Sequence, residues 1–162
     1  MTKHKIIFLL ILFWLLMPFV YSQDSYKTDS LQNLLLIKED TARLNVWAEI
    51  VFNYMKQKDL VSADSALVKA FNYAKEKNLD VPYRLKWAHA EILLYHKEGE
   101  AAMAEMKIVI AKIQETNNKT DLAKAQNFLA YIYLNIGKYN DCIETFLKSI
   151  ELAKQNKIVS TL

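Results

Sequence analysis

Glycine and proline are scarce in this chain of 162 residues, which has two of each: Gly99, Gly137, Pro18 and Pro82. Both residue types interrupt helices and dominate turns. A chain with so few of them, and with long runs of Ala, Leu, Lys and Glu, favours an all-α fold. Both glycines fall between amphipathic stretches and Pro82 precedes another, so we expect each of the three to mark the end of a helix.

Residues that carry chemistry are also scarce. Cys142 is the single cysteine, which excludes an intrachain disulfide and suits a small buried residue at a helix contact. His89 and His96 lie seven positions apart, so on one helix they stand about 10 Å apart along the axis. That separation is too large for one metal, whose His ligands lie at about 2 Å. Two isolated glycines cannot form a phosphate-binding loop, and the G-x-S-x-G motif is absent. We therefore predict no catalytic residue, no cofactor and no metal: the protein is not an enzyme.

The N-terminus has the pattern of an export signal. Lys3 and Lys5 precede a continuous apolar run, residues 6–17, and the small residue Ser22 follows Val20 and Tyr21. This pattern predicts a secretory signal peptide over residues 1–22 and a periplasmic or cell-envelope location. An uncleaved N-terminal membrane anchor is the alternative, which the short run disfavours because a membrane span needs about 20 apolar residues.

Removal of residues 1–22 changes the charge that partners would meet. The formal net charge of +3 includes Lys3 and Lys5, so it falls to +1 in the remaining 140 residues. A nearly neutral chain of this length suits one domain with a hydrophobic core and gives no basic patch for nucleic acid. We expect no nucleic-acid partner, and no membrane contact beyond the signal peptide.

The most regular pattern lies in residues 123–156. Four residues occupy the packing positions of W-x2-L-G-x2-Y, namely Gln126, Leu129, Ala130 and Tyr133. Cys142 and Phe146 follow at the A-x3-F positions, Gly137 stands between the halves, and Lys154 replaces the final Pro. This segment resembles a tetratricopeptide (TPR) repeat, which implies two antiparallel helices. Thr120 or Asp121 is expected to cap the first helix and Asn140 or Asp141 the second, whose inner side includes Ile143 and Phe146.

Two further hairpins are expected upstream, so that the repeats cover residues 42–78, 83–118 and 121–156. The first is expected to have an expanded turn at 56–63, and Gly99 is expected to occupy the turn of the second. The offset of Gly99 from Gly137 is 38 positions, four more than the usual repeat of about 34, and a polar insertion at 117–120 accounts for the surplus. Three hairpins predict a right-handed α-α superhelix, a TPR-like solenoid.

The remaining segments complete the predicted domain organisation. Residues 23–40 form a leader with a short capping helix at 30–37, begun by Asp29 or Ser30, that could cover one end of the stack. The repeat domain spans residues 41–156, and residues 157–162 form a tail.

A wider resemblance covers most of residues 24–156. The stretches DSLQNLLLIKEDTARLN, DSALVKAFNYAKEKN and AQNFLAYIYLNIGKYNDCIETFLKSIELAKQN are similar to the N-terminal region of signal-peptide-bearing TPR envelope proteins of Bacteroidetes-type bacteria. In many of those proteins a membrane helix and a histidine kinase or helix-turn-helix regulator follow. This chain ends at Leu162 without such segments, so it is either a stand-alone member or the front part of a longer protein.

The candidate binding residues follow from the geometry of such stacks, in which the first helix of each repeat lines the concave face. The predicted peptide groove comprises Lys86, His89, Leu93, His96, Lys124, Asn127, Tyr131 and Leu134. This mixture of cations, an amide, an aromatic ring and apolar groups suits an extended or helical peptide with some negative charge. Asn127 lacks the partner residues of the carboxylate clamp used by chaperone-binding TPR proteins, so that function is not expected.

The leading prediction is a non-catalytic scaffold of the cell envelope that binds a protein or peptide. One alternative is the extracytoplasmic sensory front part of a membrane-bound signalling protein. Another is a structural unit that self-associates through the C-terminal hairpin, because the ends of helical stacks expose apolar surface unless they are capped.

Overall fold

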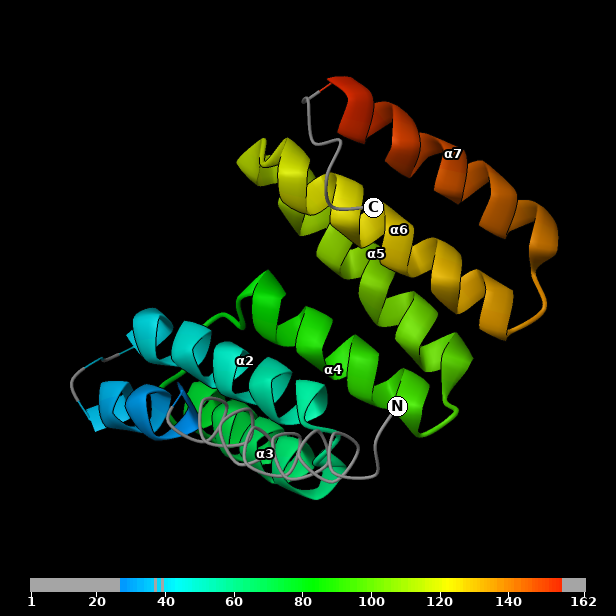
Figure 1. Cartoon of the computed structure of the whole chain (residues 1–162). Coiled ribbons are helices and arrows are strands. Elements are labelled where there is room, and N and C mark those ends of the chain that lie inside the picture. The colour runs from blue at the N-terminus through cyan, green and yellow to red at the C-terminus, as the bar shows by residue number, and fades with distance from the viewer. Residues whose placement is uncertain (1–26, 37, 39, 156–162) are drawn as a thin grey trace, which may run out of the picture.

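The computed structural model describes residues 27–155, apart from 37 and 39. Within this part the chain is helical, without strands (Figure 1). Residues 27–36 form a short helix, and six longer helices follow: α2 (Asp40–Lys56), α3 (Leu60–Glu76), α4 (Tyr83–Tyr95), α5 (Gly99–Thr116), α6 (Lys119–Asn135) and α7 (Tyr139–Gln155). The predicted signal peptide and tail lie outside the described residues.

Consecutive helices pair as hairpins that stack on one another. The pairs are α2 with α3, α4 with α5, and α6 with α7, and each consists of neighbours joined by a short turn (Figure 1). The second hairpin contacts the first through α4, which packs on α2 and α3, and the third hairpin contacts the second through α6, which packs on α5. The prediction of an all-α stack of about three helical hairpins is confirmed.

The core consists of two apolar clusters, and α4 contributes to both. Leu85, Ala88 and Ile92 of α4 join buried residues of α2 and α3 in the first cluster. Ala90 of α4, with the partly buried Trp87, belongs to the second cluster, in which α5 and α6 supply most of the buried residues. Since α4 offers side chains to both clusters, it holds the first and third hairpins in one stack.

Residues with positive φ show the true repeat length. The turns within the hairpins place Lys58, Lys97 and Gly137 in this region, at φ 61°, 64° and 77°, and the links between hairpins place Asn78 and Asn117 there. The interval from Lys58 to Lys97 is 39 positions, from Asn78 to Asn117 also 39, and from Lys97 to Gly137 it is 40. The predicted offset of 38 is wrong, because Gly137 is equivalent to Lys97 and not to Gly99.

Gly99 has a role different from the predicted one. It is the first residue of α5, it is buried, and it does not have a positive φ. A Cβ at this position would lie closer than 3.0 Å to Cγ2 of Ile136, at the end of α6. Gly99 therefore permits the close approach of two helices rather than the turn that the sequence suggested.

The connections are shorter than predicted. The supposed expanded turn at 56–63 is only 57–59, because α3 already begins at Leu60. Asp59 caps α3 by accepting a hydrogen bond from the backbone N–H of Ser62 (3.1 Å), and hydrogen bonds from Ser62 hold the pKa of Asp59 below its ordinary value. The supposed insertion at 117–120 is a two-residue link, 117–118. The residues beyond the usual repeat of about 34 therefore lie in the helices.

Several predicted helix starts also need correction. Asn118, not Thr120 or Asp121, caps α6 by accepting a hydrogen bond from the backbone N–H of Asp121. Helix α7 begins at Tyr139, which places Asn140 and Asp141 inside its first turn.

The short helix at the N-terminal end also differs from the prediction. It already includes Lys27, so Asp29 and Ser30 lie within it and do not begin it. The side chain of Asn53, buried on α2, donates a hydrogen bond of 2.5 Å to Oγ1 of Thr28. This contact fixes the short helix against the first hairpin.

Helix α7 packs on α6 through small side chains. Thr145, Ser149 and Ala153 are its buried residues, and the Ser149 hydroxyl donates to the carbonyl of Ala123 at 3.0 Å. Ile143 and Phe146, expected on the inner side, are 61% and 45% exposed. The apolar stripe of α7 is therefore largely uncovered by the described residues.

Candidate functional site

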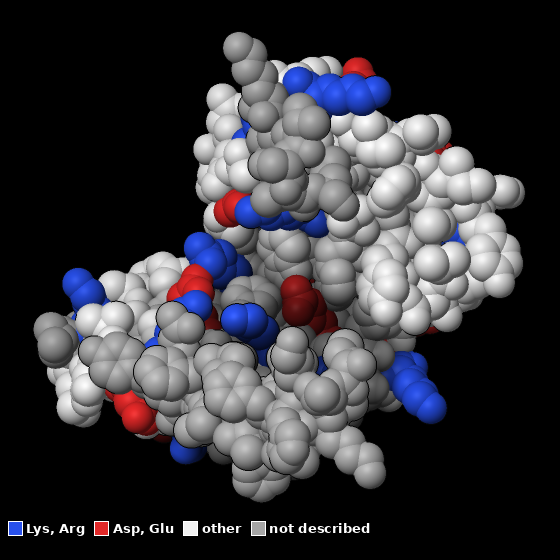
Figure 2. Space-filling view, in the orientation of Figure 1, with Lys and Arg blue, Asp and Glu red and all other residues white. Residues whose placement is uncertain are grey.

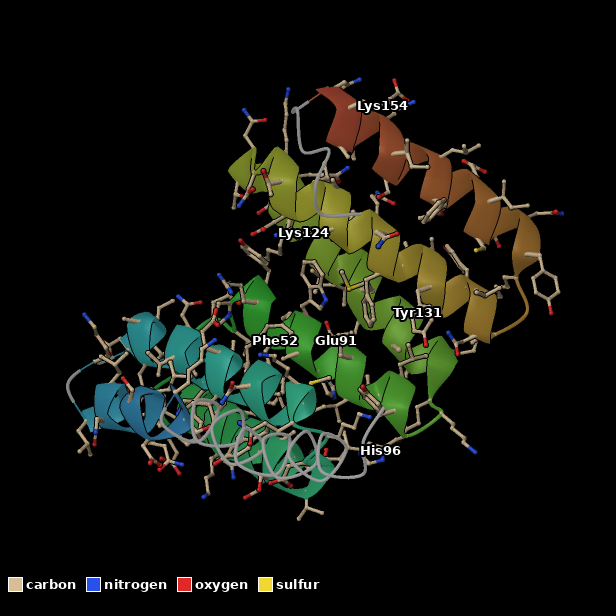
Figure 3. The ribbon with its side chains drawn as sticks, in the orientation of Figure 1. Phe52, Glu91, His96, Lys124, Tyr131 and Lys154 are labelled. Carbon is tan, nitrogen blue, oxygen red and sulfur yellow. The ribbon has the colours of Figure 1, made fainter. Side chains whose placement is uncertain are left out.

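The face formed by α2, α4 and α6 is hollowed and lined by aromatic and charged side chains. Figure 2 shows a depression with acidic and basic groups between the part built from α6 and α7 and the part built from α2 and α4. A pocket of about 170 Å³ lies here, and we call it the inner pocket; its lining residues are Phe52, Tyr83, Arg84, Trp87, Glu91, Asp121 and Lys124. Figure 3 shows Phe52, Glu91, Lys124 and Tyr131 around this space.

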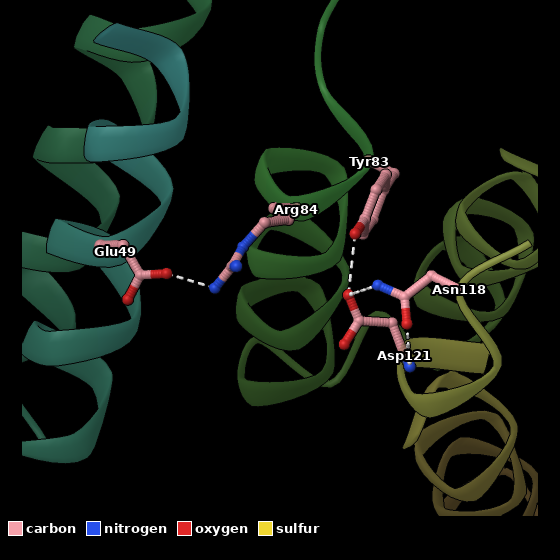
Figure 4. A network of polar contacts seen from close by, with 5 residues as sticks. All are labelled: Glu49, Tyr83, Arg84, Asn118 and Asp121. Atoms are coloured by element: carbon pink, nitrogen blue, oxygen red, sulfur yellow. Dashed lines mark hydrogen bonds and ion pairs between the residues drawn. The ribbon is translucent and has the colours of Figure 1, made fainter. Parts of the chain in front are cut away.

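Two consecutive residues at the start of α4 connect it to both neighbours. The Tyr83 hydroxyl donates to Oδ2 of Asp121 on α6 at 2.8 Å, and Arg84 pairs with Glu49 on α2 (Figure 4). Asn118 also donates to Asp121 at 3.0 Å. Burial, together with the hydrogen bond to Asp121, raises the pKa of Tyr83. These polar contacts fix the positions of the pocket's walls.

Aromatic rings continue the surface from α4 onto α6. Trp87 stacks on Phe128 with a centroid distance of 6.3 Å, and Phe128 contacts Tyr131 at 6.3 Å. Tyr131 is 54% exposed, so the end of this row is open to solvent. Aromatic rings with one open face are common anchors in protein interfaces. We call the inner pocket together with Phe128 and Tyr131 the inner face.

Glu91 is one of the two acidic residues that line the inner pocket. It is partly buried and forms no ion pair with any described residue. Burial raises the pKa of Glu91 to about 7, and only the nearby Trp87 indole opposes this increase. The Trp87 Nε1 is itself buried, and its N–H acts on the Glu91 carboxyl without the geometry of a full hydrogen bond.

The four predicted groove residues of α6 lie along one stripe. Lys124 lines the inner pocket, Tyr131 ends the aromatic row, Asn127 is partly buried and Leu134 is 50% exposed. The structure therefore brings Lys124 and Tyr131 to the inner face, where the prediction put them. Whether this stripe binds a peptide stays a prediction.

The four predicted residues of α4 do not line the inner pocket. His89 contacts Phe71 of α3 edge-on at 5.3 Å and lies 3.5 Å from Glu105 of α5, in a second hollow that is lined mainly by α3. His96 lies 3.0 Å from Asp64 of α3, and Leu93 packs in the second cluster. Lys86 is partly buried. The histidines thus face the second helices of the hairpins, not the first.

The sequence reasoning missed the residues of α4 that line the pocket: Tyr83, Arg84, Trp87 and Glu91. Trp87 and Glu91 were not among the predicted groove residues. Glu91 was the available signal, because a carboxylate rarely occupies a packing stripe without a partner. The buried trio Leu85, Ala88 and Ile92 directs the side of α4 that carries Arg84, Trp87 and Glu91 away from α3.

The described residues contain neither a metal-binding cluster nor a membrane-spanning helix. Across 27–155, no three His, Cys, Asp or Glu side chains lie close enough together to hold a metal ion. None of the helices in that part of the chain has both the length and the apolar character needed to cross a membrane. Cys142 is a free cysteine, partly buried against the second cluster.

Comparison with known proteins decides the fold. The chain is similar to a solved crystal structure, labelled Q17M, of a candidate kinesin light chain from Podospora anserina. That structure consists of nearly identical TPR-like repeats. The TM-score is 0.56, the identity is 18%, and the match covers 85% of this chain and 70% of that chain. The fold is a TPR-like helical repeat. No protein-family model matches this chain, and no curated protein matches it.

A TPR-like fold is generally a non-catalytic scaffold for protein–protein interaction. Its stacked hairpins give an extended concave surface, and here the inner face occupies the corresponding position on α2, α4 and α6. The resemblance to Bacteroidetes-type envelope proteins stays a prediction, because an identity of 18% concerns the fold alone.

Proposed function

We propose that this protein is a non-catalytic TPR-like scaffold of the cell envelope that binds a protein or peptide partner on its inner face. The observation that carries the proposal is the aromatic row of Trp87, Phe128 and Tyr131, which begins in the inner pocket. Such rings, bordered by charged groups, supply the apolar contact area and the polar rim that protein interfaces combine.

The proposed location rests on residues 1–22. Their basic start, apolar run and small residue at Ser22 have the pattern of a secretory signal peptide. Fusion of these residues to a reporter that is active only outside the cytoplasm tests this part, and an inactive reporter would contradict it. The alternative of a sensory front part rests on the resemblance alone.

Capture of a partner from envelope extract tests the binding proposal. The inner-face variant carries Lys124→Ala and Tyr131→Ser. The matched control variant carries Val68→Ser and Ile108→Ser, at two exposed apolar positions on α3 and α5. We expect a specific partner to be retained by the control and lost from the inner-face variant. Equal capture by both variants would contradict the proposal, provided that circular dichroism shows both to be folded.

Self-association is a second candidate function, favoured by the exposed apolar residues of α7. Helix α5 begins at Gly99 and α7 at Tyr139, so Ile143 and Phe146 correspond to Met103 and Met106 of α5. Those two methionines pack in the cluster to which α6 contributes. The equivalent surface of α7 is open in the described residues, with Leu147 also 60% exposed.

Sedimentation equilibrium tests this second candidate. A dimer that dissociates on Ile143→Ser with Leu147→Ser would support self-association through α7. A monomer at high concentration, or a dimer unaffected by the two substitutions, would contradict it.

A further inference from the structure

Glu91 differs from Arg84 and Asp121, two other charged residues of the inner pocket described above, in that no ion pair or hydrogen bond of good geometry with a described residue compensates its charge. Arg84 pairs with Glu49, and Asp121 accepts hydrogen bonds from Tyr83 and Asn118. Glu91 has no ion-pair partner among the described residues, and only the Trp87 indole N–H acts to lower its pKa. A carboxylate that is largely removed from water without a partner is unfavourable, so it favours a ligand that brings a positive charge.

The walls around Glu91 suit the stem of a long cationic side chain. Phe52 of α2 and Trp87 of α4 present aromatic surface in the pocket. Lysine and arginine pack their methylene groups on such surface, and their charged ends are attracted to the faces of aromatic rings. The pocket volume of about 170 Å³ is below the range of roughly 300–1,000 Å³ for drug-sized ligands. One side chain fits better than a cofactor.

Two further groups define what surrounds that side chain. The Nε1–H of Trp87 is buried and acts on the Glu91 carboxyl to lower its pKa, so it favours the ionised form that would bind a cation. Lys124 stands at the pocket's edge without an ion pair to a described residue. Because Lys124 repels a second cation, it favours an acidic residue beside the basic one in the partner.

We propose that the inner pocket receives a lysine or arginine side chain of the peptide partner, with the Glu91 carboxylate as its counter-ion and Trp87 as its aromatic wall. This inference rests on the proposed function, since it names the occupant of the same face. The other charged and titratable groups that line the pocket with Glu91 are Tyr83 and Arg84 on its own helix and Asp121 and Lys124 on α6.

A selection from a displayed library of random 12-residue peptides tests this proposal with the mature chain, residues 23–162. The variants are Glu91→Gln, which keeps the shape of the side chain, and the control Glu105→Gln, which removes a carboxylate on α5 beside His89. We expect selected peptides to contain a lysine or arginine and to bind Glu91→Gln at least tenfold more weakly. The control should bind them as the unmodified protein does.

The outcomes separate this inference from the proposed function. Peptides without a basic residue that nevertheless require Tyr131 would overturn the inference and leave the proposed function standing. Selected peptides that bind equally to Glu91→Gln, Tyr131→Ser and the unmodified protein would contradict both. Free arginine or agmatine that binds more tightly than the peptides, with the same dependence on Glu91, would make the occupant a small cation and overturn the assignment to a partner side chain.

Discussion

Gly99 and Ile136 stand against each other where the start of α5 meets the end of α6, with no space for a Cβ on the glycine. Gly99→Ala would press the new methyl group on Cγ2 of Ile136. We expect a loss of about 1–3 kcal/mol in the free energy of unfolding, as is usual for overpacking. Urea denaturation measures it.

Ile136→Leu provides the matched test of this contact, because leucine has a similar volume but no branch at Cβ. Combined with Gly99→Ala, it should recover part of the lost stability, as residues in contact do not act additively. If the double variant loses the full sum of the two single effects, the close contact is not the reason for glycine at this position.

The pKa of Glu91 predicts a pH-dependent stability. Its ordinary value is 4.5 and burial raises it to about 7, so the folded state holds a proton that the unfolded state releases between these pH values. Stability therefore falls as the pH rises through this window. The free energy of unfolding of Glu91→Gln, measured relative to that of the unmodified protein, should therefore rise by on the order of 2–3 kcal/mol when the pH is raised from 4 to 8.

Denaturant unfolding at several pH values measures this difference. The two proteins differ only at position 91, so the contributions of the other titratable groups cancel in the comparison. Parallel stability curves for the two proteins would show that Glu91 is already compensated by a counter-charge in the folded protein.

The two lysines with positive φ predict stabilising substitutions. Lys58 and Lys97 adopt a conformation that disfavours residues with a Cβ, by roughly 1–2 kcal/mol. Glycine adopts it readily, at a smaller entropic cost. Lys97→Gly should therefore raise the free energy of unfolding by about 0.5–1 kcal/mol. In contrast, Lys69→Gly, at an exposed position inside α3, should lower it by about 1 kcal/mol. Equal losses from both substitutions would contradict this explanation of the turns.

The hydrogen bond between Asn53 and Thr28 should hold the short helix, residues 27–36, against α2. Thr28→Val removes the hydroxyl that accepts from the buried Asn53 side chain at 2.5 Å. We expect a loss of about 1–3 kcal/mol, because a buried amide then loses a partner. Hydrogen exchange should become faster in residues 27–36, whereas the exposed Ser30→Ala should leave it unchanged. Unchanged exchange in Thr28→Val would show that other contacts hold this helix.

Helical periodicity and the scarcity of glycine and proline were sufficient to predict the hairpins. They also predicted that Gly137 marks the end of a helix, and it does so just after α6 with a φ of 77°. The role of Gly99 could not be predicted, because it depends on Ile136, a residue of another helix. Lys58 and Lys97 occupy turns that typically select glycine, so the true repeat length of 39–40 positions was hidden.

The inner pocket could not be predicted from the sequence either, because it depends on contacts between different helices. Phe52, Glu91 and Lys124 come from three helices, and their meeting depends on the rotation of α4 about its axis. The sequence reasoning placed Lys86 and His89 on the side of α4 that faces the groove, whereas in the structure Arg84 and Trp87 lie on that side. On α6 the predicted Lys124 lines the pocket, and the groove assignment of that helix stays a prediction.

Site-specific photo-crosslinking in cells tests the central claim, that the inner face holds the partner, most directly. A photoreactive amino acid replaces Tyr131 on the inner face or, as the matched control, Val68, which is 58% exposed on α3. We expect a crosslinked partner from position 131 and none from position 68. A crosslink from position 68 alone would place the partner on the opposite side of the stack and contradict the account.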